Sequence, residues 1–204
     1  MNFLAHFHIA WPDEGLVAGA LEGDFHKGAV TADIEPGVAA GIRLHRRIDA
    51  FTDNHPLIVQ LRERFPQHLR RYAGILIDLS FDHYLSLHWH RYSTTPLEDF
   101  TAGVHEVLER RQEHLSRGSR RMQAVLQRHD VLTRYRDWSM VVATAERIGE
   151  RFSRGNPLLD IDGELTPLRG AVETAFTAFY PELQRLRPSG IAAIGSCGQV
   201  QPRL

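Results

Sequence analysis

The stretch GIRLHRRIDAFTDNHP, at residues 41–56, has the spacing of a helix with polar side chains on one face. Pro36 can begin this helix because proline fits the first turn, and the sequence NHP at 54–56 ends it near residue 53. His45 and Asp49 are four residues apart, so both project from the same side. The spacing therefore predicts a helix that presents an imidazole and a carboxylate together.

A second segment repeats this spacing among apolar residues. In GILIDLSFDHYL, at residues 74–85, Asp78 and Asp82 are four residues apart and His83 follows directly. Burying an unpaired carboxylate is very costly, so these acids need a partner. A divalent metal would supply one and an arginine would supply another, and the sequence leaves both open. The arginines in question are Arg46 and Arg47.

Helix signals recur along the rest of the chain, whereas alternating β-branched residues are scarce. Residues 95–98, Thr-Pro-Leu-Glu, match a capping box, and apolar residues follow at helical spacing as far as Leu115. Further helices are predicted after Asp13, Pro56 and Pro66, over residues 137–151, and from Thr166 to about residue 186. The pattern predicts an all-α fold.

The length of 204 residues is enough for one hydrophobic core. We expect a single-domain helical bundle over residues 1–187. Residues 188–204, PSGIAAIGSCGQVQPRL, lack helical periodicity and are predicted to be a loose tail. Cys197, the single cysteine, has no neighbouring histidine or acid and is interpreted as an incidental thiol. One cysteine also excludes an internal disulfide or a cysteine-based zinc site.

The overall charge argues against two classes of partner. The chain has 24 basic and 25 acidic residues, a net charge of −1, which favours neither nucleic acid nor a membrane surface. No apolar run approaches a membrane span, and no basic segment precedes the first apolar residues. We therefore expect a cytoplasmic protein. Of the basic residues, only Lys27 is lysine and the other 23 are arginine.

The first ninety residues combine histidine and aspartate in four segments without cysteine. Imidazole and carboxylate together form the ligand set of hydrolytic Mg, Mn, Fe or Zn sites. Each signal has an ordinary alternative: His6 and His8 could equally pack in the core, Asp24 could end a helix, and His45 with Asp49 could be a solvated pair. Their combination favours a metal site.

Three other motifs do not support chemistry. His129-Asp130 is the only literal His-Asp doublet, but it lies where a helix is predicted to end, and we interpret it as a turn. Ser80 and Ser86 do not stand in a Gly-x-Ser-x-Gly elbow, which argues against a serine hydrolase. The glycines of GLVAGALEGDF do not form a phosphate-binding loop.

Four strings resemble the bacterial acyl carrier protein phosphodiesterases. They are MNFLAHFHIA at the start, GALEGDFHKG around Asp24, GIRLHRRIDAFTDNHP, and IDLSFDHYLSLHW at residues 77–89. Weaker matches follow in RYRDW at 134–138 and FYP at 179–181, so that the resemblance covers about residues 1–186.

The resemblance implies a metal-dependent phosphodiesterase with a distorted HD-domain-like helical fold. It implies removal of 4′-phosphopantetheine from holo acyl carrier protein, with Mn²⁺ favoured over Mg²⁺ or Fe²⁺. Asp24 is then the first candidate for an essential residue. The other ligand candidates are His6, His45, Asp49 and Asp82. The usual HD pattern has an adjacent His-Asp, whereas His45 and Asp49 are one helical turn apart.

Roles for the remaining residues follow as hypotheses. Arg46 or Arg47 would steady the phosphoryl oxygens through its guanidinium donors, and His83 would protonate the leaving serine oxygen. Residues 110–154 contain eleven arginines and five acids, an excess that would attract an acidic carrier protein. The candidate carrier-binding residues are Arg110, Arg111, Arg120 and Arg121, with a solvated helix face as the alternative.

Two other functions remain open from the residues. One is an HD-like hydrolase acting on a small nucleotide or phosphate ester, in which Tyr84 and Trp89 would stack a base. The other is a non-catalytic helical module that binds an acidic protein through its arginines, with histidine and aspartate serving structure. A non-catalytic module would hold no stoichiometric divalent ion.

Overall fold

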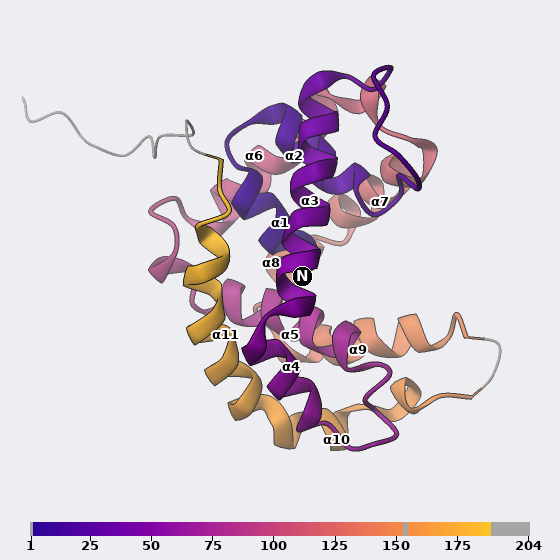
Figure 1. The fold of residues 1–204 in the computed structure, drawn as a ribbon, viewed down its shortest axis with the longest axis vertical. Coiled ribbons are helices and arrows are strands. Elements are labelled where there is room, and N and C mark those ends of the chain that lie inside the picture. Colours follow the sequence, from indigo (N-terminus) through magenta and orange to yellow (C-terminus); the bar gives the residue numbers. More distant parts are fainter. Residues whose placement is uncertain (1, 153–154, 189–204) are drawn as a thin grey trace, which may run out of the picture.

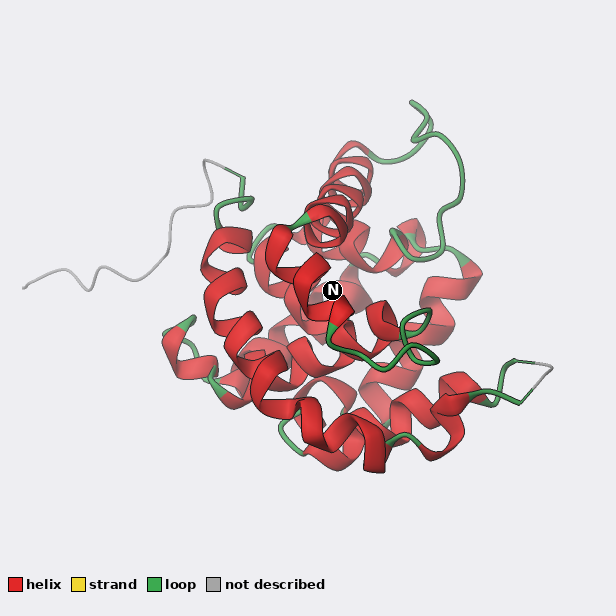
Figure 2. Ribbon diagram, turned by 60° about the horizontal axis from the view of Figure 1, so that its bottom comes forward, coloured by secondary structure: helices red, strands yellow, loops and turns green. Residues whose placement is uncertain are grey.

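A computed structural model describes residues 2–152 and 155–188, and these residues fold into one all-α domain without a strand (Figure 2). The fold class expected from the sequence is therefore confirmed. Apart from Pro188, the predicted tail with Cys197 lies outside the described residues. Within the described part of the chain, no helix is both long and apolar enough to cross a membrane.

Three N-terminal helices form the part of the fold that matters most for function. They are α1 (Phe3–Ala10), α2 (Glu14–Glu22) and α3 (Pro36–Asn54). A Cβ on Gly19 would lie 2.5 Å from the Cα of Gly41, and a Cβ on Gly15 would lie 2.6 Å from the Cα of Gly37. These close approaches need glycine on both sides, and their register means that α2 and α3 run in the same direction.

The remaining helices wrap around this group (Figure 1). They are α4 (Pro56–Glu63), α5 (Ala73–Leu87), α6 (Leu97–Arg110), α7 (Arg117–Arg128), α8 (Val131–Arg134), α9 (Trp138–Gly149), α10 (Asp162–Leu165) and α11 (Arg169–Gln184). Helix α5 contacts α1, α9 and α11, so it lies at the centre of the core. Phe81 of α5 packs edge-on against Phe176 of α11, with ring centroids 5.4 Å apart.

Several predicted helix boundaries agree with the structure. Asp13 caps α2 by accepting a hydrogen bond from Leu16 N at 2.9 Å. Pro36 and Pro56 occupy the first turns of α3 and α4. Asp137 caps α9. The His129-Asp130 doublet follows α7, and Asp130 has a φ of 46°, so its interpretation as a turn is confirmed.

Two boundary predictions are wrong. Helix α6 has Pro96 at its N-cap with no side-chain cap, and the backbone carbonyl of Thr95 instead accepts a hydrogen bond from Trp89 Nε1. The capping box therefore does not form. Pro66 begins no helix, because residues 67–72 form turns and α5 starts only at Ala73. In both cases the local sequence signal fits a turn as well as it fits a helix start.

Candidate metal centre and adjoining cavity

Three side chains from two helices converge into a group with metal-ligand chemistry. His6 of α1 and His45 and Asp49 of α3 each offer a ligand atom within 4.8 Å of the others. Nε2 of His6 lies 3.1 Å from one carboxylate oxygen of Asp49, and Nε2 of His45 lies 3.1 Å from the other. The two imidazole rings stack with centroids 4.0 Å apart. The four-residue spacing of His45 and Asp49 thus places both on the same side of α3, as predicted.

The backbone of α2 orients His45 within this group. Nδ1 of His45 lies 2.8 Å from the carbonyl oxygen of Ala20, which accepts its proton and leaves Nε2 directed at Asp49. Such a second hydrogen bond fixes the tautomer and ring orientation of a metal-binding histidine. Gly23 ends α2, and a Cβ there would lie 2.3 Å from Cγ of His45. Glycine at this position therefore makes room for the imidazole.

Burial and hydrogen bonding set the protonation states of the group. Burial lowers the pKa of His6 to about 4, although its hydrogen bond to Asp49 acts in the opposite direction. Burial also disfavours the charged form of Asp49, but hydrogen bonds from His45 and His6 outweigh it and hold the pKa of Asp49 well below its usual range. Burial also disfavours the charged form of His45, but the hydrogen bond to Asp49 and the charges of Asp49 and Asp24 outweigh it and raise the pKa of His45. A divalent cation would therefore displace a proton from His45 as it binds.

Asp24 lies beside this group, in the turn that follows α2. One of its carboxylate oxygens is 3.7 Å from Nε2 of His45, and 45% of its side chain is exposed. Burial raises the pKa of Asp24, and the attraction of His45 opposes that shift. The structure therefore brings together four of the five predicted ligands, namely His6, Asp24, His45 and Asp49.

Asp82 does not join them. Both of its carboxylate oxygens accept backbone hydrogen bonds at the start of α1, from Leu4 N at 2.8 Å and from Ala5 N at 3.1 Å. The side chain is fully buried. Its structural partners are thus the unpaired N–H groups of a helix N-terminus, which attract negative charge. These hydrogen bonds offset part of the cost of burying Asp82, and no arginine of the described chain pairs with it.

The predicted arginine and histidine partners also make other contacts. Arg46 donates to the carbonyl of His26 at 3.1 Å, and Arg47 donates to the carbonyl of Leu186 at 3.5 Å, so neither is the anchor of the acids on α5. Nδ1 of His83 lies 2.8 Å from the carbonyl oxygen of Tyr135. The His83 ring is 2% exposed and packs edge-on against Trp138.

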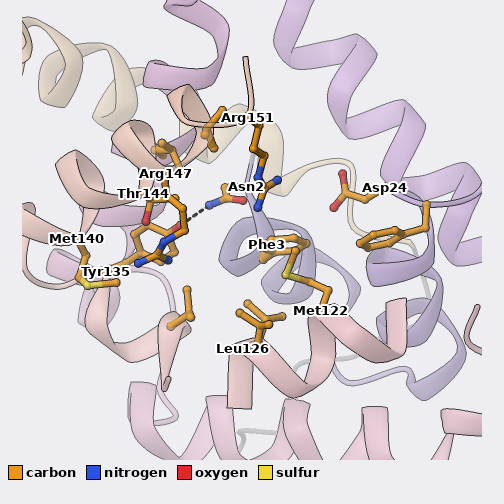
Figure 3. A pocket seen from close by; sticks show the side chains of 15 residues that line it. Asn2, Phe3, Asp24, Met122, Leu126, Tyr135, Met140, Thr144, Arg147 and Arg151 are labelled. Atoms are coloured by element: carbon orange, nitrogen blue, oxygen red, sulfur yellow. Dashed lines mark hydrogen bonds between the residues drawn. The ribbon is translucent and has the colours of Figure 1, made fainter. Parts of the chain in front are cut away.

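A cavity of about 340 Å³, drawn in Figure 3, reaches the group of His6, His45 and Asp49 through Asp24, which lines it. Asp24 lies at one side of it, and Tyr135 and Met140 lie at the opposite side. Helices α1, α7 and α9 supply most of its walls, which combine apolar side chains with a few polar ones. The lining residues include Asn2, Phe3, Leu79, Met122, Leu126, Thr144, Ile148, Arg147 and Arg151.

Sequence reasoning missed this cavity. Its residues come from segments far apart in the chain. Phe3, Asp24 and Tyr135 lie in three of the strings that resemble the family, whereas Met122 and Thr144 lie in none of them. The one available signal was the apolar face of α7 beside the arginine-rich face. The residues suggested for base stacking are in turn buried, since Tyr84 is 2% and Trp89 is 5% exposed.

The four candidate carrier-binding arginines differ in their partners. Arg110 makes two contacts with Glu14, from Nε at 3.1 Å and from a terminal nitrogen at 2.8 Å. Arg111 lies 3.5 Å from a carboxylate oxygen of Glu35. Arg120 and Arg121 are exposed on α7 and pair with no acid among the described residues. Their charge is therefore free to act on a partner.

Known proteins of one family match this chain along almost its whole length. A family model described as acyl carrier protein phosphodiesterase matches residues 1–183. A protein of that name from Escherichia coli O6:H1 is 36% identical over 184 residues, which cover 90% of this chain and 95% of that protein. Another, from Photorhabdus laumondii, is 33% identical over 184 residues, covering 89% of this chain and 92% of that protein. No solved structure matches this chain. Because these matches span almost the whole chain, including the segments that carry His6, Asp24, His45 and Asp49, the chain belongs to the acyl carrier protein phosphodiesterase family.

Proposed function

We propose that this protein hydrolyses the phosphodiester that joins 4′-phosphopantetheine to a serine of holo acyl carrier protein. Water attacks phosphorus, the bond from phosphorus to the serine oxygen breaks, and the serine oxygen takes up a proton. The products are apo carrier protein and 4′-phosphopantetheine. The observation that carries this proposal is the convergence of His6, His45 and Asp49 in a chain of this family. With this substrate, the reaction would take place in the cytoplasm.

The donor set fits a divalent cation. Two imidazoles and a carboxylate, with Asp24 as a fourth donor, suit Mn²⁺, which we favour, and also Mg²⁺ or Fe²⁺. Such a cation would neutralise phosphodiester charge and acidify an attacking water. Ala20 keeps Nε2 of His45 available through the hydrogen bond to Nδ1. The chain thus supplies an oriented set of donors before any substrate arrives.

Three other candidates act more remotely in this proposal. Arg46 donates to the carbonyl of His26, two residues after Asp24, and so holds the turn that carries Asp24 in place. His83 is buried against Tyr135 and Trp138 and is better suited to fixing α5 against the segment before α9 than to protonating the serine. For Arg47, the contact with Leu186 favours a structural role over phosphoryl binding.

The carrier protein would dock on α7. Arg120 and Arg121 are exposed there, and the same helix contributes Met122 and Leu126 to the cavity beside Asp24. An acidic partner drawn to the arginines would therefore arrive next to the candidate metal centre. Arg110 and Arg111 extend the basic surface, although Glu14 and Glu35 offset part of their charge.

Mass spectrometry of holo carrier protein tests the proposal directly. After incubation with this protein and Mn²⁺, the carrier protein should lose the mass of 4′-phosphopantetheine, and a chelator should prevent that loss. Asp24→Ala should reduce the rate to below about a tenth, as expected for loss of a metal ligand. Asp33→Ala is the matched control, because Asp33 is an exposed acid of the same loop.

A folded Asp24→Ala variant with more than a tenth of the activity would contradict the role of Asp24. A protein that holds no divalent ion and is indifferent to the chelator would favour the non-catalytic alternative.

A further inference from the structure

We infer that the cavity between α1, α7 and α9 receives the pantetheine arm of the carrier protein during hydrolysis. This inference rests on the proposed function and names a binding site for the part of the substrate that does not react. It assigns a role in substrate specificity to Tyr135 and to two residues outside the strings that resemble the family, Met122 and Thr144.

Continuity with the candidate metal centre is the first argument. The Asp24 carboxylate lies 3.7 Å from Nε2 of His45, and the same residue lines the cavity. A phosphoryl group held at the candidate metal centre is therefore next to the Asp24 side of the cavity. The arm is attached to that phosphoryl group, so it can extend from the cluster toward Tyr135 and Met140 at the opposite side (Figure 3).

Size and lining chemistry are the second argument. A volume of about 340 Å³ is at the lower end of the range for small-molecule sites, which are mostly apolar with a few polar groups. The pantetheine arm has a dimethyl branch, a hydroxyl group and two amides along an uncharged chain. Phe3, Met122 and Leu126 offer apolar contact for the branch and the methylene groups.

The polar groups suit amides. Nδ2 of Asn2 donates to the hydroxyl oxygen of Tyr135 at 2.7 Å, and Thr144 adds a second hydroxyl group to the same cavity. An amide needs both a donor and an acceptor, and hydroxyl and carboxamide side chains offer both. Arg147 and Arg151 are exposed residues of the same lining and give one side of the cavity a positive charge (Figure 3).

The test fills the cavity and compares two substrates. Met122→Trp replaces a flexible side chain of the cavity wall with an indole ring, whereas Val59→Trp adds the same ring to an exposed position of α4 that neither lines the cavity nor lies on the docking helix. The substrates, both with Mn²⁺, are holo carrier protein and bis(p-nitrophenyl) phosphate, a diester without a pantetheine arm. Met122→Trp should lower kcat/KM for holo carrier protein by about tenfold or more and change the small diester by less than about twofold. Val59→Trp should change neither.

A binding measurement separates this inference from the proposed function. Calorimetry with pantetheine, which has no phosphate, should give binding to the wild type and to Val59→Trp but not to Met122→Trp. If Met122→Trp fails to fold, Val125→Trp replaces it, since Val125 lines the cavity and is 42% exposed.

Each outcome has one meaning. If the wild type releases no 4′-phosphopantetheine but binds pantetheine in the cavity, the proposed function fails and the binding site stands. If the wild type is active and the cavity variants process holo carrier protein normally, the inference about the arm is overturned alone. An equal loss on both substrates would also overturn it, because the substitution would then act on the metal centre. Binding of a nucleoside diester in place of pantetheine would favour the nucleotide alternative.

Discussion

Helices α3 and α5 each carry two polar side chains four residues apart, but the aspartate at the end of each pair has different partners in the fold. On α3, His45 and Asp49 are four residues apart, and on α5, Asp78 and Asp82 are four residues apart. Asp49 lies between two imidazoles with 43% of its side chain exposed. Asp82 is completely buried and accepts hydrogen bonds from the backbone of α1. One acid is at a candidate metal centre, and the other acts as a structural cap.

The difference lies in what the neighbouring helix presents. Helix α1 turns the side chain of His6 toward α3 and the N–H groups of its first turn toward α5. A side-chain nitrogen offers a ligand site, whereas backbone N–H groups can only donate hydrogen bonds. Spacing along one helix therefore identifies acids that share a face, and the partner across the interface decides their role.

Removing the α3 acid should have the largest effect on activity. Loss of a residue that merely orients a metal ligand typically reduces activity by about 10- to 100-fold, so Asp49→Ala should lose more than about 100-fold on holo carrier protein. Its free energy of unfolding should fall by about 1–2 kcal/mol, because the buried imidazoles of His6 and His45 lose a hydrogen-bond partner that is itself partly exposed. Turnover by mass spectrometry and urea unfolding measure the two effects. A stable variant with near-normal turnover would remove Asp49 from the proposed centre.

Removing the α5 acid should reverse that pattern. Asp82→Ala leaves the N–H groups of Leu4 and Ala5 without their acceptor, at a cost of about 1–3 kcal/mol for each unsatisfied buried group. We expect a loss of about 2–4 kcal/mol in the free energy of unfolding. Activity per folded molecule should stay within a few fold of the wild type. If Asp82→Ala instead folds normally and loses its bound cation, the contrast between the two helices would break down.

The two acids should also differ in their response to pH. Burial raises the pKa of Asp82 from 3.8 to about 7, against the opposing effect of the N–H groups of Leu4 and Ala5. Folded protein then binds a proton that the unfolded chain releases. The stabilisation from this proton is fully present below about pH 4 and is lost as the pH rises to 7, by up to about 1.4 kcal/mol per pH unit.

Asp82→Asn has no such titration. The stability advantage of the wild type over Asp82→Asn should therefore shrink as the pH rises from 4 to 7, measured by urea unfolding at each pH. Asp49 stays charged across this range despite its burial, but it also raises the pKa of His45, so Asp49→Asn would change the titration of that histidine as well. Asp33→Asn is therefore the control, because Asp33 is exposed and the pKa of its carboxyl is lowered by a hydrogen bond with Thr31. Its stability difference should be nearly constant from pH 4 to 7, and a parallel change in Asp82→Asn and Asp33→Asn would argue against an effect of burial at Asp82.

The smallest effect is expected for the surface arginines, which also differ in whether they have a partner. Arg110 is paired with Glu14, whereas Arg120 and Arg121 have exposed, unpaired charge within the described chain. Reversing both charges, with Arg120→Glu and Arg121→Glu, should raise KM for holo carrier protein about 3- to 10-fold at low salt. Arg110→Glu should change KM less. The gap should close as salt is added, because screening weakens exposed charges, and a salt-independent KM would argue against docking on α7.

Local sequence predicted the helices well where a side chain acts on its own backbone. Asp13, Pro36 and Pro56 mark helix starts because capping and the fixed φ of proline act within one turn. The same reasoning failed at Thr95 and Pro66, where a turn uses the same residue types. The cavity was outside its reach, because Asn2 and Tyr135 are 133 positions apart and meet only in the folded chain.

The sequence by itself determined the all-α class and the placement of His45 and Asp49 on one helix face, since both depend on a periodicity of a few residues. Tertiary structure decided that Asp49 on α3 meets two imidazoles, whereas Asp82 on α5 meets backbone N–H groups. Glycines at the contact let α2 and α3 pack closely in parallel, which brings Ala20 and Gly23 against His45. Helix α1 directs His6 toward α3, and the N–H groups at its start donate hydrogen bonds to Asp82 on α5. Contacts between distant segments depend on how whole helices pack, and no spacing within one helix contains that information.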